Sequence, residues 1–348
     1  MSAPITTVNN WYGFDTVIDV RSPGEFAYDH VPCAQNMWVL DDQQRAQVGT
    51  VYKRQGPFEG RKLGGGLVAQ NTGLHIQANV LDKPKDWRPM VYCWRGGMRS
   101  NSFATVLASI GFRVSVLKGG YKAYRSQVLG ALPDLCEQPR FVVLGGKTGV
   151  GKTQLLTQLA QMGQQVLDLE GLANHRGSLF GALGLPDQPS SAKFDSLLFQ
   201  ALSAFDASRP VYVESESSKV GQCHLPKPLL ENMRQSPKID VSSALEDRVE
   251  RIALDYASAF EQPDQIKELL SKLPQRLGHE MVRAMLSMVD QGEWKMLIET
   301  LILHHYDHSY GKSHGQFVGP RLGGVESTVA DPHSAAAKVV QLVQAAAA

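Results

Sequence analysis

The sequence predicts an α/β protein with two parallel-sheet domains and a mainly helical C-terminal part. In the N-terminal third, three short β-branched segments accompany an apolar pattern with helical spacing from Ser100 to Ile110. The segments are Thr16–Val20, Met90–Tyr92 and Val114–Leu117. Alternation of strand and helix is typical of a parallel sheet. A further strand at Phe141–Leu144 leads into a glycine-rich loop and a helix, and helical spacing dominates from about Ser243.

Length and composition fit an ordinary globular protein of about two domains, at roughly 150 residues each. The chain has 348 residues, of which 43% are hydrophobic and 20% charged, and its net charge is +1. No apolar run approaches the ~18 residues that a membrane span needs, and the N-terminus lacks a signal pattern. We therefore expect a cytoplasmic protein that does not use a membrane. The small net charge of the chain does not indicate nucleic-acid binding, but it is compatible with a local basic patch that binds nucleic acid.

The cysteines favour a reduced protein with one special thiol. Cys33, Cys93, Cys136 and Cys223 show neither a C-x-x-C pair nor the spacing of a zinc site. A disulfide framework is therefore not indicated.

Composition changes along the chain suggest four parts. They are a first domain at residues 1–132, a linker at 133–139, a second α/β domain at 140–242 and a helical part at 243–348. We expect further strands of the second sheet at Val166–Leu169 and Pro210–Val213. The stretch from Asp41 to Trp87 is rich in Gly and Gln with little periodicity. It predicts a long functional insertion or mixed loop.

A reactive thiol is predicted at Cys93, which ends the strand Met90–Tyr92 and is followed by Arg-Gly-Gly-Met-Arg-Ser. Backbone N–H groups of such a turn point at the sulfur and favour the thiolate. Arg95 and Arg99 add positive charge, so we take Cys93, Arg95 and Arg99 as the candidate catalytic residues. The alternative is a buried core cysteine, which is the usual fate of a free Cys. The Arg- and Gly-rich sequence that follows argues against it.

A phosphate-binding loop is predicted after the strand Phe141–Leu144, where the chain matches the pattern G-x-x-x-x-G-K-[ST]. Its residues are Gly146, Gly149, Gly151, Lys152 and Thr153. Backbone N–H groups cradle phosphate oxygens, Lys152 neutralises them, and Thr153 is able to ligate Mg²⁺. The alternative is a plain glycine-rich turn. The pattern does not reveal whether the phosphate belongs to ATP.

Carboxylates at the ends of neighbouring strands are candidates to help hold a metal ion. Glu214 and Glu216 follow the predicted strand Pro210–Val213, and Asp168 and Glu170 are the next choice. Each is equally acceptable as a surface or capping carboxylate, and no metal site is certain.

The first domain resembles the rhodanese family. The segments that carry the resemblance are Ile18–Pro23, Glu25, His30–Pro32, Ala34, Asn36, the loop Cys93–Ser100 and the segment Leu117–Tyr121. Two features depart from the family pattern. Cys33 stands where these domains usually have Gly, and five residues separate Cys93 from Arg99, one more than in the short sulfurtransferase loop. The longer spacing is shared with cysteine phosphatases, and it suits an anion larger than sulfide.

The succession of a rhodanese-like domain and a P-loop domain resembles the tRNA 2-selenouridine synthase family. Further segments extend the resemblance over nearly the whole chain. They are Gln44–Lys53, Asp168–Ser178, Val213–Ser217 with Gly221, and the set Tyr306, Asp307 and Tyr310. The block Asp168–Ser178 is more specific than a P-loop alone. Within it, His175 and Arg176 are candidates to contact diphosphate or RNA, with a solvated loop as the alternative.

The resemblance implies an activity on tRNA. The family replaces sulfur by selenium at a wobble uridine that already carries a 2-thio group, uses selenophosphate, and is linked to an S-geranylated intermediate made from geranyl diphosphate. Lys152 would then grip geranyl diphosphate, and ATP would not be required. Cys93 would carry selenium as a perselenide or bind selenophosphate during transfer. A selenophosphate-producing enzyme is an implied partner, and the oligomeric state is left open.

Three rival functions remain at this point. The first is an ATP-dependent P-loop kinase or ATPase with a regulatory rhodanese domain. The second is a binding module without activity, although Cys93, Arg99, Lys152 and Thr153 are all present. The third is a cysteine phosphatase, which the loop spacing allows but which has no need of a P-loop domain.

Overall fold

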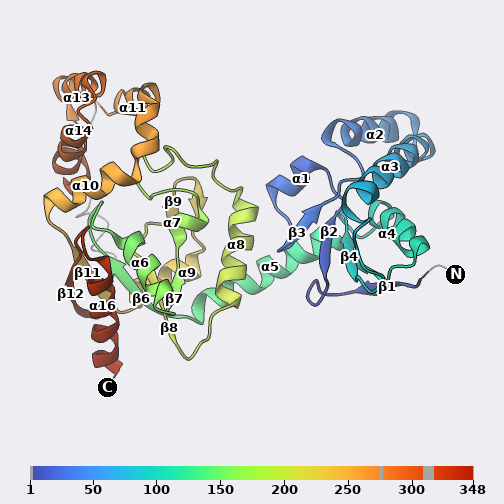
Figure 1. Ribbon diagram of the computed structural model, residues 1–348, viewed down its shortest axis with the longest axis horizontal. Coiled ribbons are helices and arrows are strands. Elements are labelled where there is room, and N and C mark those ends of the chain that lie inside the picture. Colours follow the sequence, from blue (N-terminus) through green and yellow to red (C-terminus); the bar gives the residue numbers. More distant parts are fainter. Residues whose placement is uncertain (1–2, 274–276, 309–316, 348) are drawn as a thin grey trace. The chain divides into compact units, whose positions relative to one another are not determined.

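The computed structural model describes residues 3–273, 277–308 and 317–347. Its contacts divide the chain into two compact units, which are coloured by sequence in Figure 1. Unit 1 comprises Met1–Ala131 and Asp195–Gln200, and unit 2 comprises Leu132–Phe194 and Ala201–Ala348. Among the described residues, no helix combines the length and apolar character of a membrane span.

Unit 1 is built on a parallel five-stranded sheet with the order β1-β5-β4-β2-β3. The strands are β1 (Ile5–Val8), β2 (Thr16–Asp19), β3 (Ala34–Asn36), β4 (Pro89–Tyr92) and β5 (Val114–Leu117). Helices α1 (Pro23–Tyr28), α4 (Met98–Ile110) and α5 (Gly120–Glu137) accompany it. The parallel sheet and its α/β class confirm the sequence prediction. Helix α4 ends at Gly111, whose φ of 118° is one that glycine adopts without strain.

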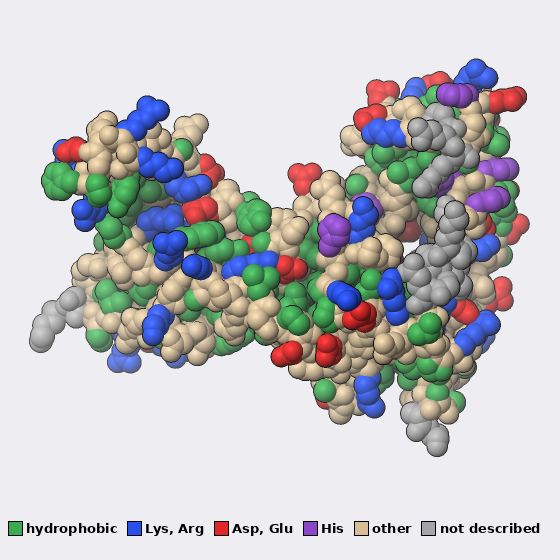
Figure 2. All heavy atoms as spheres, turned by 180° about the vertical axis from the view of Figure 1, so that it is seen from behind, with side chains coloured by type: hydrophobic (Ala, Val, Ile, Leu, Met, Phe, Trp, Pro, Cys, Tyr) green, Lys and Arg blue, Asp and Glu red, His purple; other side chains and the backbone are tan. Residues whose placement is uncertain are grey.

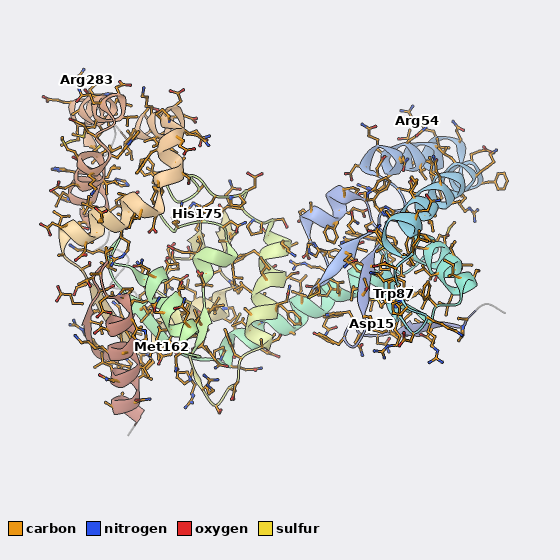
Figure 3. All side chains as sticks on the ribbon, in the orientation of Figure 1. Asp15, Arg54, Trp87, Met162, His175 and Arg283 are labelled. Atoms are coloured by element: carbon orange, nitrogen blue, oxygen red, sulfur yellow. The ribbon has the colours of Figure 1, made fainter. Side chains whose placement is uncertain are left out.

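The side chains that hold unit 1 together lie along these strands and on the inner face of α4. Val91, Phe103, Leu107 and Val116 belong to one buried cluster. Trp87, labelled in Figure 3, joins that cluster, packs edge-on against Phe112 and donates from Nε1 to Thr16.

For the stretch from Asp41 to Trp87 the sequence predicts a functional insertion or a mixed loop, and the mixed loop is wrong. The segment forms two helices, α2 (Asp42–Gln55) and α3 (Pro57–Asn79), which pack against each other. Asp41 and Gln44 form a capping box that starts α2. The glycines that suggested a loop lie in the contact: a Cβ at Gly60 would come within 2.7 Å of Cβ of Tyr52. Glycine here lets two helices approach closely. Figure 2 shows Lys and Arg side chains over this part of unit 1.

Unit 2 contains a second parallel sheet with the order β12-β11-β6-β8-β7. The strands are β6 (Arg140–Gly145), β7 (Gln165–Leu167), β8 (Pro210–Glu214), β11 (Lys238–Ser242) and β12 (Arg321–Glu326). The helices next to them are α6 (Lys152–Gln161), α7 (Leu169–Leu172), α8 (Ser191–Ser203), α9 (Lys227–Gln235) and α16 (Pro332–Ala347). A short antiparallel pair, β9 (Lys219–Val220) and β10 (Cys223–His224), lies between β8 and α9 in sequence.

The chain after residue 243 is mainly helical, as expected. Its helices are α10 (Leu245–Asp255), η1 (Ala257–Glu261), α11 (Pro263–Leu270), α13 (His279–Gln291), α14 (Trp294–Leu301) and the π-helical η2 (Ile302–Tyr306). Their apolar faces form a core of their own, to which Leu270, Met285 and Leu301 belong. The unexpected element is β12, which pairs with β11 in parallel and contributes Val325 to the core under the sheet.

The residues predicted to form a linker, 133–139, are largely helical. Helix α5 continues through Pro133 to Glu137. Proline removes one helical hydrogen bond. Val128, Leu132 and Cys136, spaced four residues apart, are nevertheless all buried. This apolar stripe keeps the helix intact across the proline.

Candidate functional site

The Cys93 thiol lies directly after β4, where the chain turns into α4. The residue is only 4% exposed. Its Sγ accepts hydrogen bonds from the Gly97 backbone N–H (3.2 Å) and the Ser100 hydroxyl (3.3 Å). Burial acts to raise the pKa of the thiol, but the bonds from Ser100 and the loop backbone, with the charge of Arg99, lower it below its usual value. Such a sulfur is prepared to act as a thiolate.

The turn between β5 and α5 holds this loop in place. The Tyr121 N–H donates to the Cys93 carbonyl (2.9 Å) and the Lys122 N–H to the Trp94 carbonyl (3.0 Å). Gly96 has a φ of 65°, and a Cβ there would lie 2.6 Å from the Leu117 carbonyl oxygen. Larger residues would push the two turns apart, so glycine is required by both conformation and space.

Arg99 is held by the carboxylate of Glu25, which the sequence analysis named in the rhodanese resemblance but not as a site residue. Its Nη1 lies 2.9 Å from Oε2 of Glu25. Glu25 also accepts from the Ser22 backbone N–H at the start of α1 (3.3 Å) and lies 3.6 Å from Arg45 of α2. Burial acts to raise the pKa of Glu25, but its contacts with Arg99 lower it. Arg95, by contrast, is exposed.

The phosphate loop connects β6 to α6 with three glycines at positive φ. The values are 159° at Gly146, 81° at Gly149 and 89° at Gly151. Lys152, the first residue of α6, donates from Nζ to the Gly146 carbonyl (3.0 Å). Arg251 of α10 supports the loop from outside, because its Nη1 donates to the Gly149 carbonyl (2.7 Å). The loop has the helix N-terminus and the lysine that bind phosphate in other proteins.

Four carboxyl groups gather beside this loop. Glu170 accepts from the Thr153 hydroxyl (3.1 Å) and from Glu216, while its backbone N–H donates to Glu214 (2.9 Å). Asp168 caps α7 by accepting from the Gly171 N–H (2.7 Å). Burial raises the pKa of all four carboxyl groups; that of Glu216, which also faces the charge of Glu170, is about 8. At neutral pH the Glu216 carboxyl group therefore retains much of its proton.

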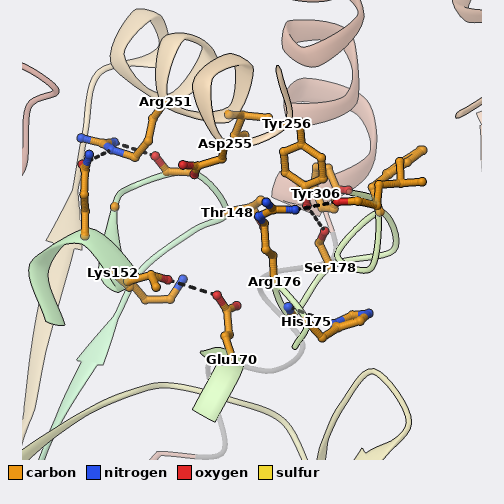
Figure 4. A pocket seen from close by; sticks show the side chains of 18 of the residues that line it. Thr148, Lys152, Glu170, His175, Arg176, Ser178, Arg251, Asp255, Tyr256 and Tyr306 are labelled. Carbon is orange, nitrogen blue, oxygen red and sulfur yellow. Dashed lines mark hydrogen bonds between the residues drawn. The ribbon is translucent and has the colours of Figure 1, made fainter. Parts of the chain in front are cut away.

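The loop and three of these carboxyl groups, those of Asp168, Glu170 and Glu216, line a cavity of about 600 Å³, which Figure 4 shows from close by. The polar end is lined by Lys152, Thr153, Glu170 and Glu216. Another part of the wall is apolar. It consists of Phe180, Leu183, Leu185, Ile252, Ala259, Phe260, Ile266, Leu297, Ile298, Leu301, Tyr306 and Phe317. The cavity thus offers anion-binding groups at one part of its wall and hydrocarbon at another.

His175 and Arg176 also line this cavity. His175 is buried, and its Nδ1 accepts a hydrogen bond from the Gly177 N–H (3.1 Å). Its pKa is lowered by burial and by the nearby charge of Arg176. The Arg176 guanidinium lies 4.6 Å from the ring centre of Tyr256 and donates to the Leu183 carbonyl (2.8 Å). The alternative of a solvated loop is therefore wrong for His175.

Each of the two units matches a known protein family. The sequence model of the rhodanese-like domain matches residues 7–127, and that of the tRNA 2-selenouridine synthase AAA domain matches residues 139–318. The tRNA 2-selenouridine synthase of Marinobacter nauticus is 33% identical over 329 residues, which cover 84% of this chain and 87% of that protein. That of Sulfurovum sp. NBC37-1 is 32% identical over 324 residues, with shares of 84% and 87%. The chain belongs to the tRNA 2-selenouridine synthase family.

Within this member of the family, the predicted site residues fall into two groups. Cys93 and Arg99 lie together in unit 1, whereas Arg95 is on the exposed side of the same loop. The phosphate-loop residues lie together in unit 2 with Asp168, Glu170, Glu216, His175 and Arg176 around one cavity. Glu214 is fully buried behind Glu170 rather than on the cavity wall.

Sequence reasoning missed Arg248 and Arg251, which reach the phosphate loop from α10, and named Asp307, which follows η2, only as part of the family resemblance. Asp307 bonds both to Lys147 of the loop (2.8 Å) and to Arg248 (2.7 Å). Arg248 and Arg251 are three residues apart on α10, so they share a helix face. The three-residue spacing of Arg248 and Arg251 is the pattern in the sequence that could have indicated a shared site. Tyr310, which the sequence analysis grouped with Asp307, lies outside the described residues.

Proposed function

We propose that this protein converts the 2-thiouridine at the wobble position of tRNA into 2-selenouridine through an S-geranyl intermediate. The observation that carries the proposal is the cavity of unit 2, where a phosphate loop and an apolar wall share one space. Geranyl diphosphate has the same two parts, a charged diphosphate and a branched hydrocarbon chain. A hydrocarbon chain gains free energy by leaving water, at about 25 cal/mol per Å² buried.

The first step is alkylation of sulfur. The uridine sulfur attacks C1 of the geranyl group, the C1–O bond breaks, diphosphate leaves, and N3 of the base loses its proton. Lys152 and the loop N–H groups stabilise the charge that develops on the diphosphate. Arg176, on the same cavity wall, is placed to add a second positive charge. The alkylated sulfur is then a good leaving group from C2.

Mg²⁺ fits the polar end of this cavity. It usually takes one or two carboxylates with substrate phosphates and water. Thr153, Glu170 and Glu216 offer a hydroxyl and two carboxyl groups beside the loop. When bound, the ion would neutralise diphosphate charge. Metal binding would favour the ionised forms of Glu170 and Glu216, whose pKa values are raised by burial.

The second step introduces selenium in unit 1. Selenium of selenophosphate, supplied by a selenophosphate-producing enzyme, attacks C2 and geranylthiolate leaves. The Cys93 thiolate then attacks phosphorus, so that an S–P bond forms and the P–Se bond breaks, and water later releases phosphate from the cysteine. Selenium keeps its oxidation level throughout, and no oxidant is needed. The wider C-x5-R loop, with Arg99 beside Cys93, suits a phosphoryl group.

Mass analysis of nucleosides tests the proposal. Thiolated tRNA is incubated with the protein, geranyl diphosphate and selenophosphate, and 2-selenouridine is the expected product. Unchanged 2-thiouridine would overturn the proposal. With Cys93→Ala we expect geranylation to remain intact while formation of 2-selenouridine stops, because the P–Se bond is no longer broken; simultaneous loss of both activities would contradict the division of the steps. ATP turnover measured with and without tRNA tests the rival kinase or ATPase function.

A further inference from the structure

Trp94 is an exposed aromatic residue that directly follows the buried Cys93 in the chain. It is 41% exposed, whereas Trp11 and Trp87 of the same unit are 5% and 4% exposed. A large apolar ring in water adds nothing to the core. Its position next to Cys93 places it where a substrate of that thiol has to arrive.

The ring of Trp94 rests on a rigid support. Its backbone carbonyl is fixed by the Lys122 N–H, and its ring lies 5.3 Å from that of Tyr121. Tyr121 is fixed in turn, because its hydroxyl donates to Asp29 (2.8 Å) and the Arg21 guanidinium lies 4.0 Å from its ring centre. One side of Trp94 is therefore supported and the rest is accessible.

Two cationic residues neighbour Trp94: Arg95 follows it in the chain, and the backbone N–H of Lys122 donates to its carbonyl. Arg95 and Lys122 are both exposed and line a shallow hollow together with Gly119, Ala123 and Ser126. Within the part of the chain that the structure describes, neither forms an ion pair with a carboxylate. Their charges are thus available to an anionic partner.

We propose that Trp94 is the stacking platform for the wobble base, and that Arg95 and Lys122 hold the phosphates next to it. The inference rests on the proposed function, which requires C2 of that base to reach the Cys93 loop. A base in an anticodon loop gains access to an enzyme by being splayed out, and splayed RNA bases stack on aromatic side chains. Stacking tolerates different substituents on the base. The same platform therefore serves the thiolated, geranylated and selenated forms.

The test uses tryptophan fluorescence of the full-length protein. An anticodon stem-loop that carries 2-thiouridine is titrated into wild type, Trp94→Phe and Trp94→Ala. We expect quenching in wild type that is lost in Trp94→Phe, because the reporting ring is gone. In Trp94→Ala, binding followed by a label on the RNA should be roughly 5- to 100-fold weaker, the range expected for one stacked base. Trp94→Phe should bind more tightly than Trp94→Ala.

Two controls separate stacking from structural damage. Tyr12 is another exposed aromatic residue of unit 1, and Tyr12→Ala should bind the stem-loop as wild type does. Iodoacetamide alkylation of Cys93, followed on its peptide by mass spectrometry, should be unchanged in Trp94→Phe. Removing Arg95 and Lys122 together should lower the slope of log K against log salt by roughly 1.4, about 0.7 for each phosphate contact.

The outcomes distinguish this inference from the function on which it rests. Quenching that persists in Trp94→Phe, or unweakened binding by Trp94→Ala, overturns the platform and leaves the proposed function standing. A wild-type protein that binds no stem-loop and leaves 2-thiouridine unchanged overturns both.

Discussion

The Ser100 hydroxyl and the Gly97 N–H act on one sulfur atom, and their effect opposes that of burial. An isolated buried thiol would be a weaker acid than a free cysteine. Here the donors and the charge of Arg99 outweigh burial, and the pKa of Cys93 falls. Part of this arrangement follows from sequence, since Cys93, Gly97 and Ser100 belong to one short loop. The Glu25–Arg99 ion pair does not, because its partners are 74 residues apart.

We predict that Ser100→Ala raises the pKa of Cys93. The thiolate loses a hydrogen-bond donor, so the rate of alkylation at neutral pH should fall by roughly fivefold to tenfold. The pH dependence of iodoacetamide labelling at Cys93 measures the shift. Ser109→Ala on the same helix is the control, because its hydroxyl bonds only to a backbone carbonyl of α4. Equal pH profiles for Ser100→Ala and wild type would contradict the prediction.

At the scale of elements, the α2–α3 pair shows where sequence patterns fail. Glycine lowers helix propensity by about 1 kcal/mol relative to alanine, and α3 contains several. Propensity and periodicity therefore favoured a loop. Packing decides otherwise, because Gly60 and Gly64 face Tyr52 and Val48 of α2. That contact is invisible until the partner helix is known.

Two alanine substitutions on α3 should have opposite effects on stability. Gly65→Ala meets no atom within 4 Å and should stabilise unit 1 by roughly 0.5–1 kcal/mol. Gly60→Ala would press against the backbone and Cβ of Tyr52 and should destabilise it by roughly 1–3 kcal/mol. Denaturant unfolding of both variants measures the difference. Stabilisation by Gly60→Ala would show that the helices are not in contact.

Asp307 joins three elements, since its carboxylate bonds to Lys147 of the phosphate loop and to Arg248 of α10, and it follows η2. Burial acts to raise the pKa of Asp307, but these cations lower it. A carboxylate with a lowered folded-state pKa stabilises the fold above about pH 4 and loses that effect as pH falls further.

We predict that Asp307→Asn destabilises unit 2 by roughly 1–3 kcal/mol at pH 7, because Arg248 is left buried without its charge partner. The difference from wild type should be constant between pH 7 and 5 and shrink below about pH 4. Thermal unfolding over this range measures it. Asp290→Asn, which removes an exposed ion pair with Lys267, should change little. A difference that grows as pH falls would contradict the assignment.

At the scale of the whole molecule, the two chemical sites lie in different units. Each motif is continuous in sequence, which is why the thiol loop and the phosphate loop were both predictable. The apolar wall of the cavity was not, because it combines side chains from Phe180 to Phe317 that no local pattern connects. The addition of β12 to the edge of the second sheet was not predictable from a local pattern either.

Separate sites predict separable activities. Lys152→Ala should fail to geranylate tRNA, because the diphosphate loses its cation, but it should still selenate tRNA that is supplied already geranylated. Cys93→Ala should show the reverse pattern. Nucleoside mass analysis with thiolated and geranylated tRNA measures all four combinations. Failure of Lys152→Ala on geranylated tRNA would place both steps at the phosphate loop.

The late position of β12 has a consequence for how the protein is made. Domains generally fold as units during synthesis, beginning at the N-terminus. The strand β11 pairs with β12 on one side, and α16 packs against α6, so the second sheet and its covering helix are completed only after residues 321–347 have left the ribosome. Until then one edge of β11 offers unpaired N–H and C=O groups, which invite wrong pairing. The nascent chain thus carries a finished thiol loop well before its phosphate loop has a complete sheet beneath it.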